Sequence, residues 1–140
     1  MAAPQHILGL DYGDKRVGVA VSHVVARLPR PLAVIANDDN LMSNIQHTVA
    51  QEGAGLVVVG LPRGMDGGYT EQTRRAEDFA KALQTIVDVP VELADETLTS
   101  VDAETYLGAG PHTKDAVDAV AASLILERYL AGHPAPEATA

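Results

Sequence analysis

The sequence of 140 residues contains no cysteine and no tryptophan, and aromatic residues make up only 4% of it. Without cysteine the chain can form neither a disulfide nor a cysteine-ligated zinc site, which suits a reducing compartment such as the cytoplasm. No apolar run approaches the roughly 20 residues of a membrane-spanning helix, and the first residues do not have the pattern of a signal peptide. A hydrophobic content of 46% still suffices for one core of valine, leucine, isoleucine and alanine. We therefore expect one domain over residues 1–131 and a disordered, Pro- and Ala-rich tail over 132–140.

Basic residues are also scarce, since ten of them stand against 19 acidic ones and the net charge is −9. This balance argues against a general nucleic-acid binder, because neutralising phosphates requires lysine and arginine. Clustering matters more than the average, however. Eight of the ten bases fall in or near loops that could meet on one face of the protein: Lys15, Arg16, Arg27, Arg30, Arg63, Arg74, Arg75 and Lys114.

The hydrophobic pattern predicts the element order β-β-β-α-β-α-β-α-α. Two β-branched runs over 7–11 and 16–22 form a hairpin, and further strands are expected over 32–36 (at an edge), 56–59 and 89–94. Helices are expected after residues 37–40, from Thr70, after Thr99, and from Thr113 to about Leu130. The order indicates an α/β fold with a mixed sheet and helices on its faces. Sites in such sheets lie at the carboxyl ends of the parallel strands.

Asp11 lies at the carboxyl end of the first predicted strand, where a sheet can hold a carboxylate rigidly. Gly13 and Gly18 leave room for another backbone or a phosphate chain to come close, and Lys15 and Arg16 add positive charge. The same stretch is equally typical of a β-turn aspartate followed by two solvated bases. On these residues alone the two interpretations are balanced.

Three positions predict a cluster of carboxylates: Asp11, the pair Asp95-Glu96, and Asp118. Asp118 lies among alanines and valines of the last helix, where a carboxylate is costly unless a charge or a metal pairs with it. The alternative is an exposed i,i+4 pair with Lys114. Three converging acids without a Cys or His cluster favour Mg²⁺ or Mn²⁺, and two such ions suit hydrolysis of phosphodiesters.

Other polar residues are weaker candidates for the site. Asp66 belongs to a glycine-rich loop and is more typical of a turn. His23 and His112 are expected near the site, but none of the five histidines has the spacing of metal ligands, and surface or core roles fit them better.

Four motifs appear in order, and together they resemble the YqgF family, also called RuvX, of the RNase H-like superfamily. The motifs are GLDYGDKRVGVAVS from Gly9, VVGLPRGMDG from Val58, DETLTS from Asp95, and KDAVDAVAA from Lys114. The resemblance implies an RNase H-like fold, with a five-stranded mixed sheet whose second strand is antiparallel. It also implies a metal-dependent nuclease site of Asp11, Glu96 and Asp118, and so chooses Glu96 over Asp95.

The resemblance also implies a substrate. The family is implicated in maturing the 5′ end of pre-16S rRNA, with a Holliday-junction resolvase as the alternative activity. We expect Gly13, Lys15, Arg16 and Lys114 to contact a nucleic-acid backbone, with structured RNA favoured over branched DNA and a ribosomal precursor particle as a partner. The sequence leaves open endo- or exonucleolytic cutting and whether the chain forms a homodimer.

The chain departs from the family pattern at two positions, and the sequence leaves open whether they weaken activity. The family often has aspartate where this chain has His23, and arginine where it has Thr97. Thr97 and the net charge of −9 slightly favour a non-catalytic RNA- or ribosome-binding module as the second hypothesis. An ATP-using actin-like kinase, suggested by the first motif, is disfavoured because the chain is too short for a second domain. The three acids are all present, so an active nuclease is the prediction.

Overall fold

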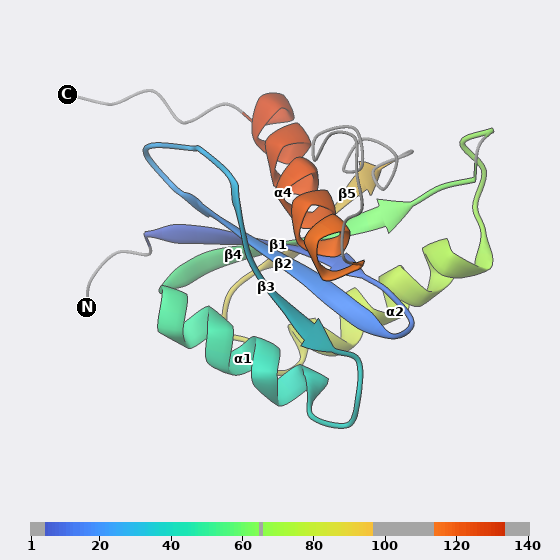
Figure 1. The fold of residues 1–140 in the computed structure, drawn as a ribbon, viewed down its shortest axis with the longest axis horizontal. Helices are drawn as coiled ribbons and strands as arrows, with labels where there is room; N and C mark the ends of the chain where they lie inside the picture. Colours follow the sequence, from blue (N-terminus) through green and yellow to red (C-terminus); the bar gives the residue numbers. More distant parts are fainter. Residues whose placement is uncertain (1–4, 65, 97–113, 134–140) are drawn as a thin grey trace.

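A five-stranded mixed sheet in the order β3-β2-β1-β4-β5 forms the centre of the computed structural model (Figure 1). The model describes residues 5–64, 66–96 and 114–133, and the side chains of residues 96, 114 and 115 lie outside that description. β1, β4 and β5 run parallel, while β2 is antiparallel to both of its neighbours. This topology confirms the predicted sheet. The strands are β1 (His6–Tyr12), β2 (Arg16–His23), β3 (Arg30–Ala36), β4 (Ala54–Pro62) and β5 (Val91–Glu96).

The third strand begins two residues earlier than predicted. The sequence pattern treats Pro31 as part of a break, whereas β3 starts at Arg30 and includes it. β3 is an edge strand and pairs only with β2, so a residue without an N–H group can be accommodated there.

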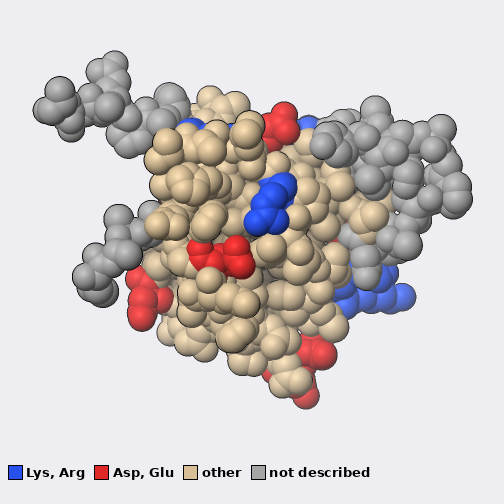
Figure 2. All heavy atoms as spheres, turned by 60° about the vertical axis from the view of Figure 1, so that its left-hand side comes forward, with Lys and Arg blue, Asp and Glu red and all other residues tan. Residues whose placement is uncertain are grey.

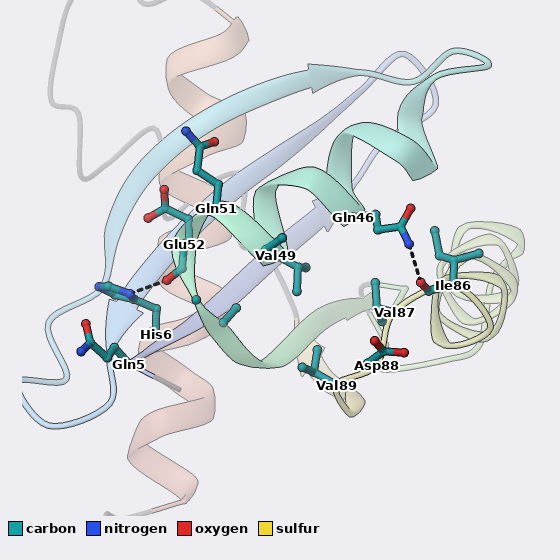
Figure 3. Close-up of a pocket in the computed structure, with 13 residues that line it drawn as sticks. Gln5, His6, Gln46, Val49, Gln51, Glu52, Ile86, Val87, Asp88 and Val89 are labelled. Carbon is teal, nitrogen blue, oxygen red and sulfur yellow. Dashed lines mark hydrogen bonds between the residues drawn. The ribbon is translucent and has the colours of Figure 1, made fainter. Parts of the chain in front are cut away.

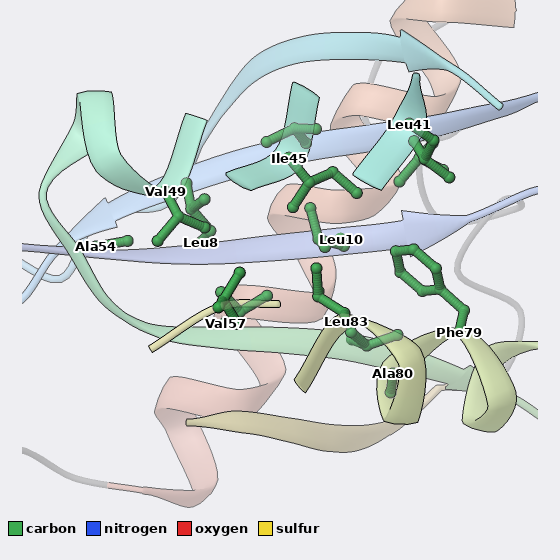
Figure 4. Close-up of a cluster of buried hydrophobic side chains, with 14 of the residues drawn as sticks. Leu8, Leu10, Leu41, Ile45, Val49, Ala54, Val57, Phe79, Ala80 and Leu83 are labelled. Carbon is green, nitrogen blue, oxygen red and sulfur yellow. The ribbon is translucent and has the colours of Figure 1, made fainter. Parts of the chain in front are cut away.

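Two helices, α1 (Leu41–Glu52) and α2 (Glu71–Gln84), cover one face of the sheet (Figure 1). Their apolar sides pack on alternate residues of the central strands, such as Leu8 and Leu10 of β1 (Figure 4). Gly53 ends α1 with a φ of 62°, a left-handed conformation that glycine adopts at little cost. α2 begins at the predicted place, and Thr70 caps it by accepting a hydrogen bond from the backbone N–H of Thr73.

The opposite face is covered, among the described residues, by α4 (Lys114–Gly132) (Figure 1). It packs on the other set of alternate residues, among them Ile7, Ala20 and Val58. The helix continues two residues beyond the predicted end at Leu130, so Gly132, the first residue of the expected tail, is helical. Residues 134–140 of that tail lie outside the described residues. The helix expected after Thr99 lies outside them too, as does Thr113, where the last helix was expected to begin. Within the described ranges, no helix combines the length and apolarity needed to cross a membrane.

Candidate active site

Asp11 lies on the face of the sheet that α4 covers. In β1, Leu8 and Leu10 pack with α1 and α2, whereas Ile7 packs with α4. Gly9 also faces α4, because a Cβ atom there would lie 2.5 Å from Cγ of Leu126. Successive side chains of a strand alternate between the two faces. Asp11, two residues after Gly9, is therefore directed toward α4 at the carboxyl end of β1.

A glycine on the neighbouring strand brings α4 close to this position. Gly18 of β2 is the pairing partner of Asp11. A Cβ atom on Gly18 would lie only 2.0 Å from the backbone oxygen of Asp118, which shows how closely the two backbones meet. The space predicted beside Gly18 is thus filled by another backbone, not by a phosphate. As a result, Asp118 lies over the strand position next to Asp11.

The carboxylate of Asp118 forms an ion pair with the sheet. Arg16 Nε lies 3.0 Å from Asp118 Oδ2, and the two side chains are 29% and 25% exposed. The sequence predicts that a carboxylate in this apolar stretch needs a charged partner, and Arg16 confirms this. The alternative pair with Lys114 involves a side chain outside the described part of the chain.

The third predicted acid comes from the far edge of the sheet. β5 ends at Glu96, whose backbone pairs with that of Pro62. Asp95 is 71% exposed and forms an ion pair with Arg63 at 3.3 Å. Among the side chains that the structure describes, no three His, Cys, Asp or Glu residues are grouped as a metal site, and that of Glu96 is not among them. The predicted three-acid cluster is therefore untested at Glu96.

The β1–β2 hairpin, which carries the predicted substrate contacts, is tied to two other elements. Asn37, just after β3, donates its side-chain N–H to the oxygen of Gly13 at 2.8 Å and its backbone N–H to that of Lys15 at 3.0 Å. Arg75 of α2 contacts both carboxylate oxygens of Asp14 at 3.0 Å. Sequence reasoning placed Asn37 only in a helix-entry cluster, because a contact across 24 residues leaves no local signal.

The sequence model of the RuvX family, described as "Holliday junction resolvase", matches residues 5–132. This chain belongs to the RuvX family. A relative from Chloroflexus aggregans is 44% identical over 132 residues, covering 90% of this chain and 93% of its own. A relative from Azotobacter vinelandii is 38% identical over 141 residues, covering 96% of this chain and 99% of its own. Both are named "Putative pre-16S rRNA nuclease", so this is a family of enzymes that hydrolyse phosphodiester bonds.

Two solved structures share the fold of this RuvX-family chain. Thermus thermophilus RuvC in complex with a Holliday junction substrate superposes with a TM-score of 0.56 at 15% identity, covering 94% of this chain and 97% of RuvC. The fowlpox virus Holliday junction resolvase superposes with a TM-score of 0.54 at 14% identity, covering 91% of this chain and 99% of the resolvase. At such low identity the likeness shows the fold alone, and it confirms the predicted RNase H-like architecture.

The predicted basic face is wrong for two of its arginines. Arg27 donates to the oxygen of Leu130 at the end of α4, and Arg30 pairs with Val21, far along β2 from Gly18. Four of the others form ion pairs with acids, namely Arg16, Arg63, Arg74 and Arg75. On the face shown in Figure 2, lysine and arginine form separate spots rather than a continuous surface. Local ion pairs thus offset much of the positive charge that the sequence pattern grouped together.

Two smaller predictions have opposite outcomes. His23 was expected near the site, but it pairs with His6 at the other end of the β1–β2 ladder, five positions from Asp11. There its Nδ1 accepts the backbone N–H of Val25 at 3.0 Å. Asp66 was predicted to make a turn, and its Oδ1 accepts the N–H of Gly68 at 2.8 Å. Thr97 and His112 lie outside the described residues.

A hollow among the described residues is remote from the acids. It has a volume of about 760 Å³ and lies where β1 and β4 begin, at the opposite end of these strands from Asp11, between the ends of α1 and α2 (Figure 3). His6 and Glu52 line it, and the His6 Nδ1 atom is hydrogen-bonded to the backbone oxygen of Glu52 at 2.6 Å. Another hollow, about 390 Å³, lies beside the hairpin and is lined by Tyr12, Asn37 and Arg75 among others.

Proposed function

We propose that this RuvX-family chain is a divalent-metal-dependent nuclease that matures the 5′ end of pre-16S rRNA. The observation that carries the proposal is the contact between Asp118 and Gly18, the strand partner of Asp11. It brings two acids that are 107 positions apart in the sequence to one face at one end of the sheet. The names of the relatives supply the RNA substrate.

The donor set suits a hard cation. Asp11 and Asp118 offer carboxylate oxygens, which Mg²⁺ and Mn²⁺ prefer. Position 96 is in the same phase of β5 as Glu92, which bonds to Tyr129 of α4, so the strand alternation supports Glu96 as the third ligand. In our proposal Asp11, Glu96 and Asp118 hold two ions and are the catalytic residues. Bound there, such ions would supply an activated water and stabilise the charge that develops on the phosphate.

The other residues of the proposed site bind the substrate. Lys15 and Arg16 extend from the hairpin beside Asp11, and Lys114 opens the helix that carries Asp118. Their charges would hold the RNA backbone, and the anchored turn at Gly13 would fix where they meet it. A cytoplasmic setting completes the proposal, since a cysteine-free chain suits a reducing compartment.

The test is cleavage of a precursor rRNA fragment by the purified protein with Mg²⁺ or Mn²⁺, and with EDTA. Asp11→Asn should lower the rate at least about 100-fold, because it removes a metal ligand and leaves the fold intact. Asp88→Asn is the matched control, since Asp88 is exposed and lines the remote hollow. Equal cleavage by the Asp11→Asn protein would refute the assignment, and RNA binding without any metal-dependent cleavage would favour the non-catalytic module.

A resolvase is the second candidate, because the family description names that activity. A four-way DNA junction should therefore be assayed beside the RNA fragment. A homodimer belongs to this alternative, since a two-fold symmetric junction is matched by a two-fold symmetric enzyme. Faster cutting of the junction, together with a dimeric mass in solution, would favour the resolvase over the rRNA nuclease.

A further inference from the structure

We propose that Arg16 occupies the carboxylate of Asp118 until a metal ion takes its place, and that the released guanidinium then binds the substrate phosphate. This inference rests on the proposed function, because it assumes that Asp118 is a metal ligand. It adds an order of events, in which metal binding prepares the protein for the nucleic acid.

The contact between the two residues is close and partly shielded from water. Arg16 is the first residue of β2 and belongs to the same alternate set as Gly18, which faces α4. Its Nε lies 3.0 Å from Oδ2 of Asp118, and less than a third of either side chain is exposed. Charges in such a setting interact more strongly than a fully exposed pair.

A guanidinium at this distance competes with a metal ion for the same carboxylate. Both are cations, so they repel each other when held on one carboxylate, and each weakens binding of the other. Once displaced, Arg16 requires another anion, and a phosphate suits its planar fork of donors. The same side chain can therefore neutralise the acid in the resting protein and contact the backbone of the substrate.

The other paired arginines at this end of the sheet do not contact Asp118. Arg63 pairs with Asp95 and Arg75 with Asp14, and these two acids are 71% and 61% exposed. Neither acid is among the three proposed metal ligands. The competition is thus expected for Arg16 and not for arginine in general.

The first experiment titrates the purified protein with Mn²⁺ in a calorimeter, without nucleic acid. Arg16→Gln should bind Mn²⁺ about fivefold more tightly than the unaltered protein, because the competing cation is gone. Lys15→Gln is the control, since it removes one charge from the adjacent, exposed position. It should change the affinity less than about twofold. If the circular-dichroism spectrum shows that the Arg16→Gln protein is unfolded, the Arg16→Met protein, whose side chain keeps an apolar stem, is titrated instead.

The second experiment tests the release to phosphate. Binding of a precursor rRNA fragment is measured in EDTA and in Ca²⁺, which stands in for the catalytic ion. Arg16→Gln should weaken binding in Ca²⁺ by about tenfold and in EDTA by less than about threefold.

The outcomes separate this inference from the function on which it rests. If Asp118→Asn binds Mn²⁺ as tightly as the unaltered protein, the proposed metal site fails. If Asp118→Asn loses the metal but Arg16→Gln binds it no more tightly than Lys15→Gln does, only the exchange is overturned. If Arg16→Gln weakens RNA binding equally in EDTA and in Ca²⁺, the exchange is likewise overturned and the nuclease proposal stands.

Discussion

The backbone oxygen of Asp118 lies 2.0 Å from the point where a Cβ atom on Gly18 would be. No side chain larger than hydrogen fits between β2 and α4 there unless one of the backbones moves. Since Gly18 pairs with Asp11, the same contact fixes the spacing between the two acids. We therefore expect both the stability of the fold and the proposed nuclease activity to depend on the absence of a side chain at position 18.

We expect Gly18→Ala to lower both the free energy of unfolding and the nuclease rate. The added methyl must push α4 from the sheet, which should cost about 1–3 kcal/mol, as overpacking does elsewhere. Urea denaturation and the cleavage assay measure the two effects. Gly132→Ala is the control, because no atom lies within 4 Å of a Cβ atom there, and it should stay within about 0.5 kcal/mol. A fully active, stable Gly18→Ala protein would contradict the close approach.

Asn37→Ala should loosen the β1–β2 hairpin and weaken substrate binding. It removes the side-chain donor to Gly13, and the hairpin should then exchange its backbone hydrogens faster around residues 13–15. We expect KM for RNA to rise severalfold, while Mn²⁺ affinity stays unchanged because the acids are not touched. Asn44→Ala on the exposed side of α1 is the control and should leave both quantities as they are.

Thr73→Val should destabilise the junction between β4 and α2. Thr73 is fully buried, and its hydroxyl accepts the N–H of Thr70 at 3.0 Å and donates to the oxygen of Pro62. Valine has the same shape but leaves both partners without this bond, at a cost of about 1–3 kcal/mol in the free energy of unfolding. Thr48→Val, whose hydroxyl bonds only within α1, should cost less than about 0.5 kcal/mol. Similar costs for the two variants would contradict this account of the junction.

Tyr129 makes stability depend on pH in the alkaline range. Burial, followed by the hydrogen bond to Glu92, raises the pKa of Tyr129 to about 12 from 10.0. The raised pKa means that the protonated phenol favours the folded state. This contribution is fully present below pH 10 and is lost as the pH rises toward 12. Thermal melts of the Tyr129→Phe protein should fall less steeply over this range than those of the unaltered protein, and parallel curves would contradict the assignment.

Much of the fold could be predicted from the chain because its signals are local. Alternating and β-branched runs mark the strands, Thr70 begins α2, and Gly53 ends α1. The order of these elements indicates a mixed sheet, and strand ends are where its polar residues gather. The placement of Asp11 at the carboxyl end of β1 followed from the same local pattern.

The pairing of distant side chains was decided only by the tertiary structure. Nothing near Arg16 in the sequence indicates Asp118 as its partner, and nothing near Asn37 indicates the hairpin. The predicted basic face failed at Arg27 and Arg30 for the same reason, since bases in or near loops were grouped together although these two arginines lie away from the acids. The sequence by itself determined the type and order of the described elements, and their ends to within a few residues, because backbone propensity and alternation act over short stretches. Which charges meet depends on how α4 and the hairpins cross the sheet, and only packing sets that.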